Sequence, residues 1–131
     1  MTMLVRLLLA AFILIAPPAF AADLIGRVVG ILDGDTLTLL TPGKRQVRVR
    51  LAGIDAPESR QPYGTRAQQE LSGLAFGKNG RIEVQDTDRY GRTVGTLFIG
   101  ALNVNQEMVR RGAAWVYTQY NRDPVLPRLE V

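Results

Sequence analysis

Apolar and polar residues alternate along most of the chain, which is the pattern of strands that bury one face. The first two runs cover residues 24–32 and 36–40, and Asp33-Gly34 between them is typical of a hairpin turn. A turn signal at residues 41–44 leads to a third run at 46–51, in which valine and leucine alternate with polar side chains. These runs predict three consecutive strands whose arginines face away from the core.

The same alternation predicts a second hairpin later in the chain. Residues 81–85 and 93–99 have strand patterns, and the glycine-containing segment 88–92 between them indicates a turn. A short extended run is expected at residues 114–117, where we expect Trp115 in the core and Tyr117 in the core or at its rim. The strands therefore come in two groups, three before residue 52 and the rest after residue 80.

Two helices are predicted between and after these strands. A capping box of Thr65 and Gln68 opens the first helix, which is amphipathic and is expected to end at Gly77. The second is short, with Asn103 as its N-cap and Gly112 at its end. Five short strands with inserted helices favour a mainly β, α+β fold: a closed barrel of the oligonucleotide/oligosaccharide-binding (OB) type with two or three flanking helices.

The C-terminal segment predicts a helix that is cut short. Asp123-Pro124 resembles a helix cap followed by the first helical position. Pro127 falls within the first turn, and the sequence ends at Val131. We therefore expect a truncated last helix, and a barrel that is less well covered on that side.

The first 21 residues have the pattern of a secretory signal peptide. They contain one basic residue, an apolar run at 7–16, a proline pair, and a small-x-small cleavage pattern at 19–21. A membrane anchor would need about twenty continuous apolar residues, and the prolines interrupt the run before that length. We expect export to the periplasm or the medium, with one domain at 22–131 and no membrane attachment after cleavage.

The residue types that are absent from the chain exclude several kinds of catalytic and metal site. The 131-residue chain has no cysteine and no histidine, which excludes disulfides, thiolate sites, histidine general bases and nearly all zinc patterns. Its 16 lysines and arginines exceed its 12 acidic residues, for a net charge of +4, which suits a polyanionic partner. Any hydrolytic chemistry must therefore use carboxylates, arginines and a bound metal.

Three acidic residues are candidates for metal binding, although each also has a simpler explanation. Asp35 follows a hairpin dipeptide, Asp55 could cap a turn, and Glu58 could be a solvated loop residue. If the strand that ends near residue 51 pairs with the strand that begins near Asp35, the three carboxylates converge. Converging acids need a cation, and oxygen ligands alone favour calcium or magnesium.

Two arginines could act with these acids on a phosphate. Arg50 lies at the end of the third strand, and Arg92 follows the turn glycine of the second hairpin. Either one alone could be an ordinary solvated arginine. Together, beside a metal, two guanidinium groups would form a cradle for phosphoryl transfer.

Four ordered segments of the chain resemble the staphylococcal nuclease-like, or thermonuclease, domain family. They are Asp33-Gly34-Asp35-Thr36, the segment from Arg50 to Glu58, Asp88-Arg89-Tyr90-Gly91-Arg92, and the segment from Asn103 to Ala114. The resemblance extends from about Ile25 to Tyr120, which is nearly the whole chain after the signal peptide. It implies an OB-fold, calcium-dependent phosphodiesterase that acts on DNA and RNA and leaves a 3′-phosphate and a 5′-hydroxyl.

The resemblance also implies a role for each site residue. Asp35 and Asp55 would bind Ca²⁺ through their side chains, and Ala56 through its backbone carbonyl. Glu58 would act as general base or orient the attacking water. Arg50 and Arg92 would hold the phosphate and stabilise its developing charge.

Substrate contacts outside the reacting group are implied for Arg89, Tyr90 and Tyr120. Their rings and guanidinium group are suited to stacking on bases and to contacting flanking phosphates. An alternative interpretation is an OB module that binds nucleic acid but is catalytically weak or inactive, because the shortened C-terminus loosens the site. In either case we expect a monomer. Cleavage of single-stranded DNA in calcium would separate the two.

Overall fold

The structure, a computed structural model, describes residues 23–130. The signal peptide predicted for residues 1–21 lies outside the described residues. Across the described part of the chain, no helix is long and apolar enough to cross a membrane.

The elements follow the predicted order with two short additions. In sequence they are β1 (Leu24–Asp33), β2 (Thr36–Leu40), β3 (Gln46–Leu51), β4 (Ile54–Asp55), α1 (Gly64–Ala75), β5 (Asn79–Thr87), β6 (Thr93–Ile99), β7 (Leu102–Asn103), α2 (Val104–Arg110), β8 (Trp115–Val116) and α3 (Leu126–Leu129). The elements that sequence patterns did not indicate are the two-residue strands β4 and β7, and the short run expected at residues 114–117 contains β8.

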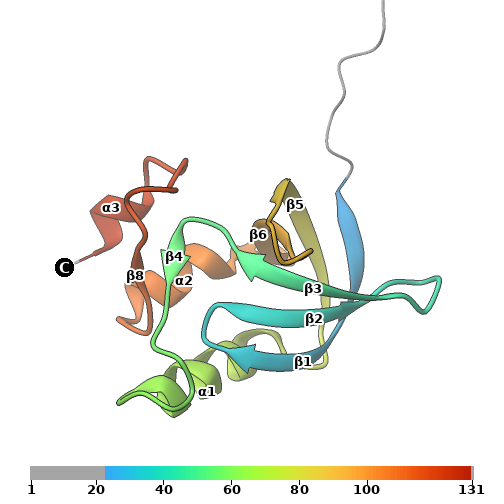
Figure 1. Cartoon of the computed structure of the whole chain (residues 1–131), viewed down its shortest axis with the longest axis horizontal. Coiled ribbons are helices and arrows are strands. Elements are labelled where there is room, and N and C mark those ends of the chain that lie inside the picture. Colours follow the sequence, from blue (N-terminus) through green and yellow to red (C-terminus); the bar gives the residue numbers. More distant parts are fainter. Residues whose placement is uncertain (1–22, 131) are drawn as a thin grey trace, which may run out of the picture.

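Five long strands form a closed barrel (Figure 1). β1 pairs antiparallel with β2 and β5, β2 with β3, and β5 with β6. A parallel pairing of β3 with β6 closes the ring. The five-stranded OB-type barrel with three small helices confirms the predicted fold class.

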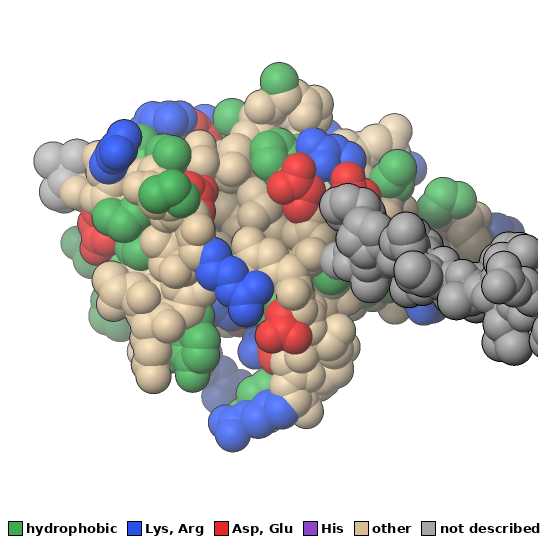
Figure 2. All heavy atoms as spheres, turned by 90° about the horizontal axis from the view of Figure 1, so that it is seen from above, with side chains coloured by type: hydrophobic (Ala, Val, Ile, Leu, Met, Phe, Trp, Pro, Cys, Tyr) green, Lys and Arg blue, Asp and Glu red, His purple; other side chains and the backbone are tan. Residues whose placement is uncertain are grey.

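The barrel interior is filled by the alternating apolar residues of these strands. Leu37, Leu39 and Val49 are fully buried in the hydrophobic core. Gly95 lets β6 lie tightly between its two partners, because a Cβ there would be 2.4 Å from the Glu83 carbonyl oxygen. Outside the core, the face seen in Figure 2 intersperses basic and acidic side chains among small groups of apolar ones.

The helices differ from the sequence prediction in their caps. α1 begins at Gly64 and not at a Thr65–Gln68 capping box: its N-cap is Tyr63, which has φ 63° and makes no side-chain cap. The loop approaching the helix is too tight for the extended backbone of an ordinary cap. At α2 the prediction is confirmed, since the Asn103 Oδ1 accepts the Gln106 N–H at 3.0 Å.

The C-terminal segment packs against the molecule even though its helix is short. α3 begins at Leu126 and not at Asp123, whose Oδ1 instead accepts the Val125 N–H at 2.9 Å. Leu126 is 1% exposed and belongs to the core.

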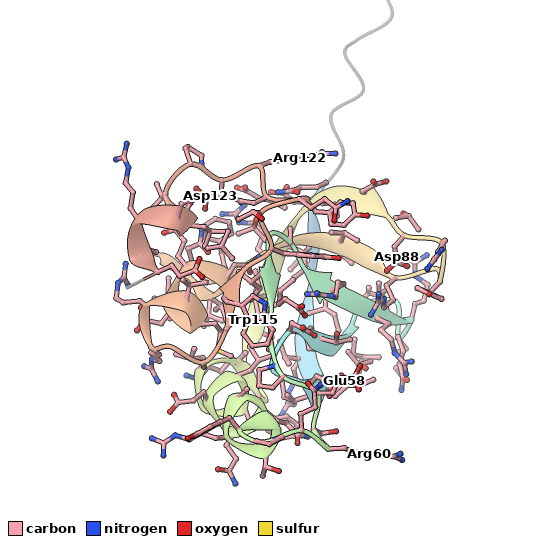
Figure 3. The ribbon with its side chains drawn as sticks, turned by 60° about the vertical axis from the view of Figure 1, so that its left-hand side comes forward. Glu58, Arg60, Asp88, Trp115, Arg122 and Asp123 are labelled. Carbon is pink, nitrogen blue, oxygen red and sulfur yellow. The ribbon has the colours of Figure 1, made fainter. Side chains whose placement is uncertain are left out.

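The expectation of a buried Trp115 is wrong, because this residue is 45% exposed (Figure 3). In β8 the neighbouring Val116 faces inward, so Trp115 must face outward.

Candidate active site

The pairing of β2 with β3 brings Asp35 beside Arg50, as predicted. Thr36 is the register partner of Arg50, and the Leu51 N–H donates to the Asp35 carbonyl oxygen at 2.8 Å. The β1–β2 turn thus holds Asp35 next to the end of β3, where the acidic segment begins.

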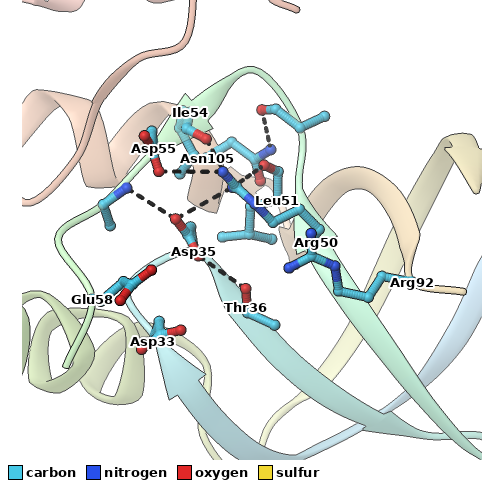
Figure 4. A network of polar contacts seen from close by, with 12 residues as sticks. Asp33, Asp35, Thr36, Arg50, Leu51, Ile54, Asp55, Glu58, Arg92 and Asn105 are labelled. Atoms are coloured by element: carbon cyan, nitrogen blue, oxygen red, sulfur yellow. Dashed lines mark hydrogen bonds and ion pairs between the residues drawn. The ribbon is translucent and has the colours of Figure 1, made fainter. Parts of the chain in front are cut away.

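The Asp35 carboxylate is buried, and both of its oxygens have polar partners (Figure 4). Its Oδ1 accepts the Thr36 hydroxyl at 2.9 Å, and its Oδ2 accepts the Ala56 N–H at 2.9 Å. The Arg50 Nη1 lies 3.4 Å from the same Oδ2. These three partners satisfy the polar atoms of a carboxylate that is taken out of water.

Arg50 joins the two aspartates and also braces the turn between β3 and β4. Its Nη2 lies 3.4 Å from the Asp55 Oδ1, so one guanidinium contacts both carboxylates. Its Nη1 donates to the Ile54 carbonyl at 2.8 Å and to the Leu51 carbonyl at 3.1 Å. This planar fork fixes the separation of Asp35 and Asp55.

Glu58 stands in the exposed loop between β4 and α1. Its N–H donates to the Gln61 Oε1 at 2.8 Å, and the next N–H, from Ser59, donates to the Asp33 Oδ1 at 3.2 Å. The Glu58 side chain lies on the same side of β4 as Asp35 (Figure 4). Within residues 23–130 its carboxylate makes no hydrogen bond or ion pair, so it is open to water.

Arg92 is positioned by the turn between β5 and β6. The Asp88 carboxylate accepts the Arg92 Nε at 2.7 Å and the backbone N–H groups of Tyr90 and Arg92 at 2.9 and 3.0 Å. Burial raises the pKa of Asp88, but the hydrogen bonds from Arg92 and Tyr90 outweigh it and the net pKa is lowered. The Arg92 terminal nitrogens have no partner among residues 23–130, so they can bind an anion.

A groove of about 580 Å³ adjoins these groups and is lined by Arg50 and Arg92. The other predicted substrate residues, Arg89, Tyr90 and Tyr120, also line it, as does Tyr117, whose ring lies 4.9 Å from that of Tyr120. The structure therefore gathers five of the predicted site residues at one groove, and Arg50 connects this groove to Asp35 and Asp55.

Of the three acids predicted to converge on a metal, the structure brings Asp35 and Asp55 together through Arg50. In the portion of the chain that the structure describes, no three acidic side chains are grouped closely enough to hold an ion. The predicted convergence of Asp35, Asp55 and Glu58 is therefore wrong, because Glu58 sits on its own loop. Asp35 and Asp55 nevertheless face one positive charge and offer only oxygen donors, which fits a hard cation such as Ca²⁺ or Mg²⁺.

Two further residues support the site and were not predicted. Arg122 lines the groove from the segment after β8. Asn105 is buried, and its Nδ2 donates to the carbonyls of Ala52 and Gly95 at 2.9 and 3.2 Å while its Oδ1 accepts the Leu97 N–H at 3.1 Å. An asparagine placed inside an apolar helix face is the signal that could have revealed Asn105.

Residues 48–130 match the family model described as staphylococcal nuclease homologue. The chain is 48% identical over 114 residues to an uncharacterized endonuclease of Escherichia coli O157:H7, covering 86% of this chain and 74% of the relative. It is 46% identical over 131 residues to protein ParB of Escherichia coli, covering 92% and 73%. It is 41% identical over 126 residues to a micrococcal nuclease of Shigella flexneri, covering 89% and 72%.

Proposed function

This chain belongs to the staphylococcal nuclease homologues, and we propose that it is an exported, calcium-dependent nuclease that hydrolyses phosphodiester bonds of DNA and RNA. One observation carries the proposal. The Asp35 and Asp55 carboxylates share the Arg50 guanidinium at 3.4 Å each, and Arg50 lines a groove together with Arg92, whose terminal nitrogens have no hydrogen-bond or ion-pair partner among residues 23–130. Acids for a cation and arginines for a phosphate thus lie together.

In the proposed reaction, one set of residues binds the ion and another binds the phosphate. Asp35, Asp55 and the Ala56 carbonyl would hold the ion, which supplies positive charge against the phosphate and its attacking water. Arg50 and Arg92 bind the phosphate oxygens and stabilise the charge that builds on them in the transition state.

Glu58 is the residue that receives a proton from water. Its carboxylate makes no hydrogen bond or ion pair within residues 23–130 and lies on the Asp35 side of β4, so it is free to accept a proton from a water that attacks a phosphate held by Arg50. Attack on phosphorus with departure of the 5′ oxygen leaves a 3′-phosphate and a 5′-hydroxyl. Arg89, Tyr90 and Tyr120 hold the adjoining nucleotide in the groove by stacking and charge.

Export and a monomeric state complete the proposal. The sequence of the first 21 residues, with its short apolar run and cleavage pattern, supports export. The well-covered barrel, with Leu126 in the core, supports a domain that folds as a single copy.

The test is cleavage of single-stranded DNA by the chain without residues 1–21, measured against calcium concentration and stopped with a chelator. We expect Glu58→Gln to lower the rate by a factor on the order of a hundred, as removal of a general base does. Glu83→Gln, an exposed acid on β5 outside the groove, should keep the wild-type rate. Binding without cleavage in saturating calcium would favour the catalytically weak OB module, and full activity of Glu58→Gln would remove that residue from the mechanism.

A further inference from the structure

A second hollow, of about 590 Å³, lies beside the active site and is lined in part by Pro57, Tyr63, Arg66 and Trp115. The groove and this hollow lie at opposite ends of the β4–β8 ladder. At the groove end, Tyr117 donates its N–H to the Gly53 carbonyl at 2.8 Å. At the other end the chains run on to Pro57 and Ala113, which line the second hollow.

The hollow presents two aromatic rings to solvent. Trp115 is 45% exposed and Tyr63 is 80% exposed. Tyr63 has φ 63°, in the left-handed region that residues other than glycine seldom occupy. Exposed rings of this size are suited to contact with a flat ligand and contribute little to the core.

The rings lie next to the reacting groups. Trp115 is the register partner of Asp55 in the β4–β8 ladder. Pro57, which lines the hollow, directly precedes Glu58 in the chain. Figure 3 shows Trp115 above α1, on the side of the molecule that carries Glu58.

Two arginines, Arg66 and Arg111, line the hollow and are suited to contact the phosphates of a nucleic-acid strand. Arg66 makes no ion pair with an acidic side chain of residues 23–130. Arg111 also lines the hollow, and its charge is partly balanced by Glu70 at 2.9 Å and by Glu107. Aromatic rings with one free guanidinium form the combination that binds single-stranded nucleic acid without sequence preference.

We infer that this hollow is a second nucleotide subsite, in which Trp115 and Tyr63 stack on bases of a single-stranded substrate on the far side of the scissile phosphate from the groove. The inference rests on the proposed function, since it takes the phosphate to lie at Arg50. The strand would pass from the groove over Arg50 and Asp55, past Glu58, and onto Trp115. Only unpaired bases can splay onto such rings, so single strands are preferred over duplex.

Trp115 is the only tryptophan in the chain, so its fluorescence reports on the hollow directly. In the slow Glu58→Gln variant with calcium, an oligothymidylate of about eight nucleotides should quench this fluorescence, because an OB fold binds about 4–16 nucleotides. Thymidine 5′-phosphate, which fills only the groove, should not. An oligonucleotide that binds by fluorescence anisotropy without altering the tryptophan emission would overturn the inference.

Kinetics provide a second test that separates this subsite from the catalytic groups. Trp115→Ala should lower kcat/KM on the oligothymidylate about tenfold, since stacking contributes about 1–3 kcal/mol per base. On the methyl ester of thymidine 5′-phosphate, whose only group on the far side of the phosphate is a methyl with no ring to stack, its effect should be below about twofold. Trp115→Phe and Tyr63→Asn, the latter tolerant of positive φ, give partial losses on the oligonucleotide alone.

Phe76→Ala is the matched control, because Phe76 is 54% exposed but lies outside both the groove and the second hollow. It should leave both substrates unaffected. Equal losses on both substrates in Trp115→Ala would indicate a structural role and would overturn the subsite. A wild-type chain that cleaves neither substrate, yet shows the tryptophan quench, would overturn the proposed nuclease function and leave the subsite standing.

Discussion

Asp88 is the carboxylate that holds Arg92 in the groove, and its ionisation should make the β5–β6 turn sensitive to pH. The net pKa of Asp88 lies below its usual 3.8 because Arg92 and Tyr90 donate hydrogen bonds to it. A lowered pKa contributes stability that is fully present above about pH 4 and is lost as the pH falls through the folded-state pKa. Asp88→Asn should therefore lower the free energy of unfolding at pH 7 by about 1–3 kcal/mol.

Urea denaturation at pH 7 and at about pH 3 measures this difference, which should shrink at the lower pH. Asp86→Asn is the control, because within residues 23–130 the Asp86 carboxylate accepts one hydrogen bond, from the N–H of the next residue at 2.8 Å. An Asp88→Asn penalty that stays the same at both pH values would contradict the assignment.

At the scale of single residues, the sequence showed which side chains carry the chemistry more reliably than it showed which side chains are exposed to solvent. The acids and arginines of the site stood out because a chain without histidine or cysteine has few other reactive groups. The exposed Trp115 could not be foreseen, since a two-residue strand is too short for alternation to show which residue faces inward. Arg122 was missed because it lies in a segment without regular structure, where spacing does not indicate direction.

At the scale of elements, the junction of the Glu58 loop with α1 depends on a glycine. A Cβ at Gly64 would lie 1.8 Å from the Glu58 carbonyl oxygen, so Gly64→Ala must displace the loop that carries Glu58. We expect a loss of about 1–3 kcal/mol in stability, as for other forced overpacking, and slower cleavage. Urea denaturation and the rate on single-stranded DNA measure the two effects.

Gly73→Ala, in the same helix, is the matched control. A Cβ at Gly73 meets nothing within 4 Å, so alanine should raise stability by about 0.5–1 kcal/mol through helix propensity and leave the rate unchanged. Gly64→Ala with a wild-type rate would show that catalysis does not depend on the position of the Glu58 loop.

The long elements were predictable, whereas the two-residue strands β4 and β7 were not. Five strands with buried alternating residues repeat their signal over enough positions to be recognised, as at β2 and β3. The β4–β8 ladder has two residues on each side and exists because Ile54 and Val116 are brought together in the core. The cap of α1 was mispredicted because a tight loop imposed a left-handed Tyr63 over the local Thr65–Gln68 pattern.

At the scale of the whole molecule, substrate binding should depend on salt through the arginines of the groove. For single strands, log K falls with log salt with a slope of about −0.7 per phosphate neutralised. Arg122→Ala should make the slope shallower by about 0.7, because its side chain lines the groove. Anisotropy titrations of a labelled oligothymidylate at several salt concentrations measure the slope.

Arg128→Ala, on α3 and outside the groove, changes the net charge by the same amount. It should leave the slope unchanged. Equal effects of the two substitutions would mean that overall charge, and not the groove, governs binding.

The pairing of Asp55 with Trp115 also sets the order in which activity can arise during synthesis. The two residues are 60 positions apart in the chain, yet they are register partners in one short ladder. A nascent chain that has emerged only as far as β6 has every strand of the barrel but lacks the strand that lies beside Asp55. Nuclease activity should therefore be withheld until the region beyond residue 116 has left the ribosome.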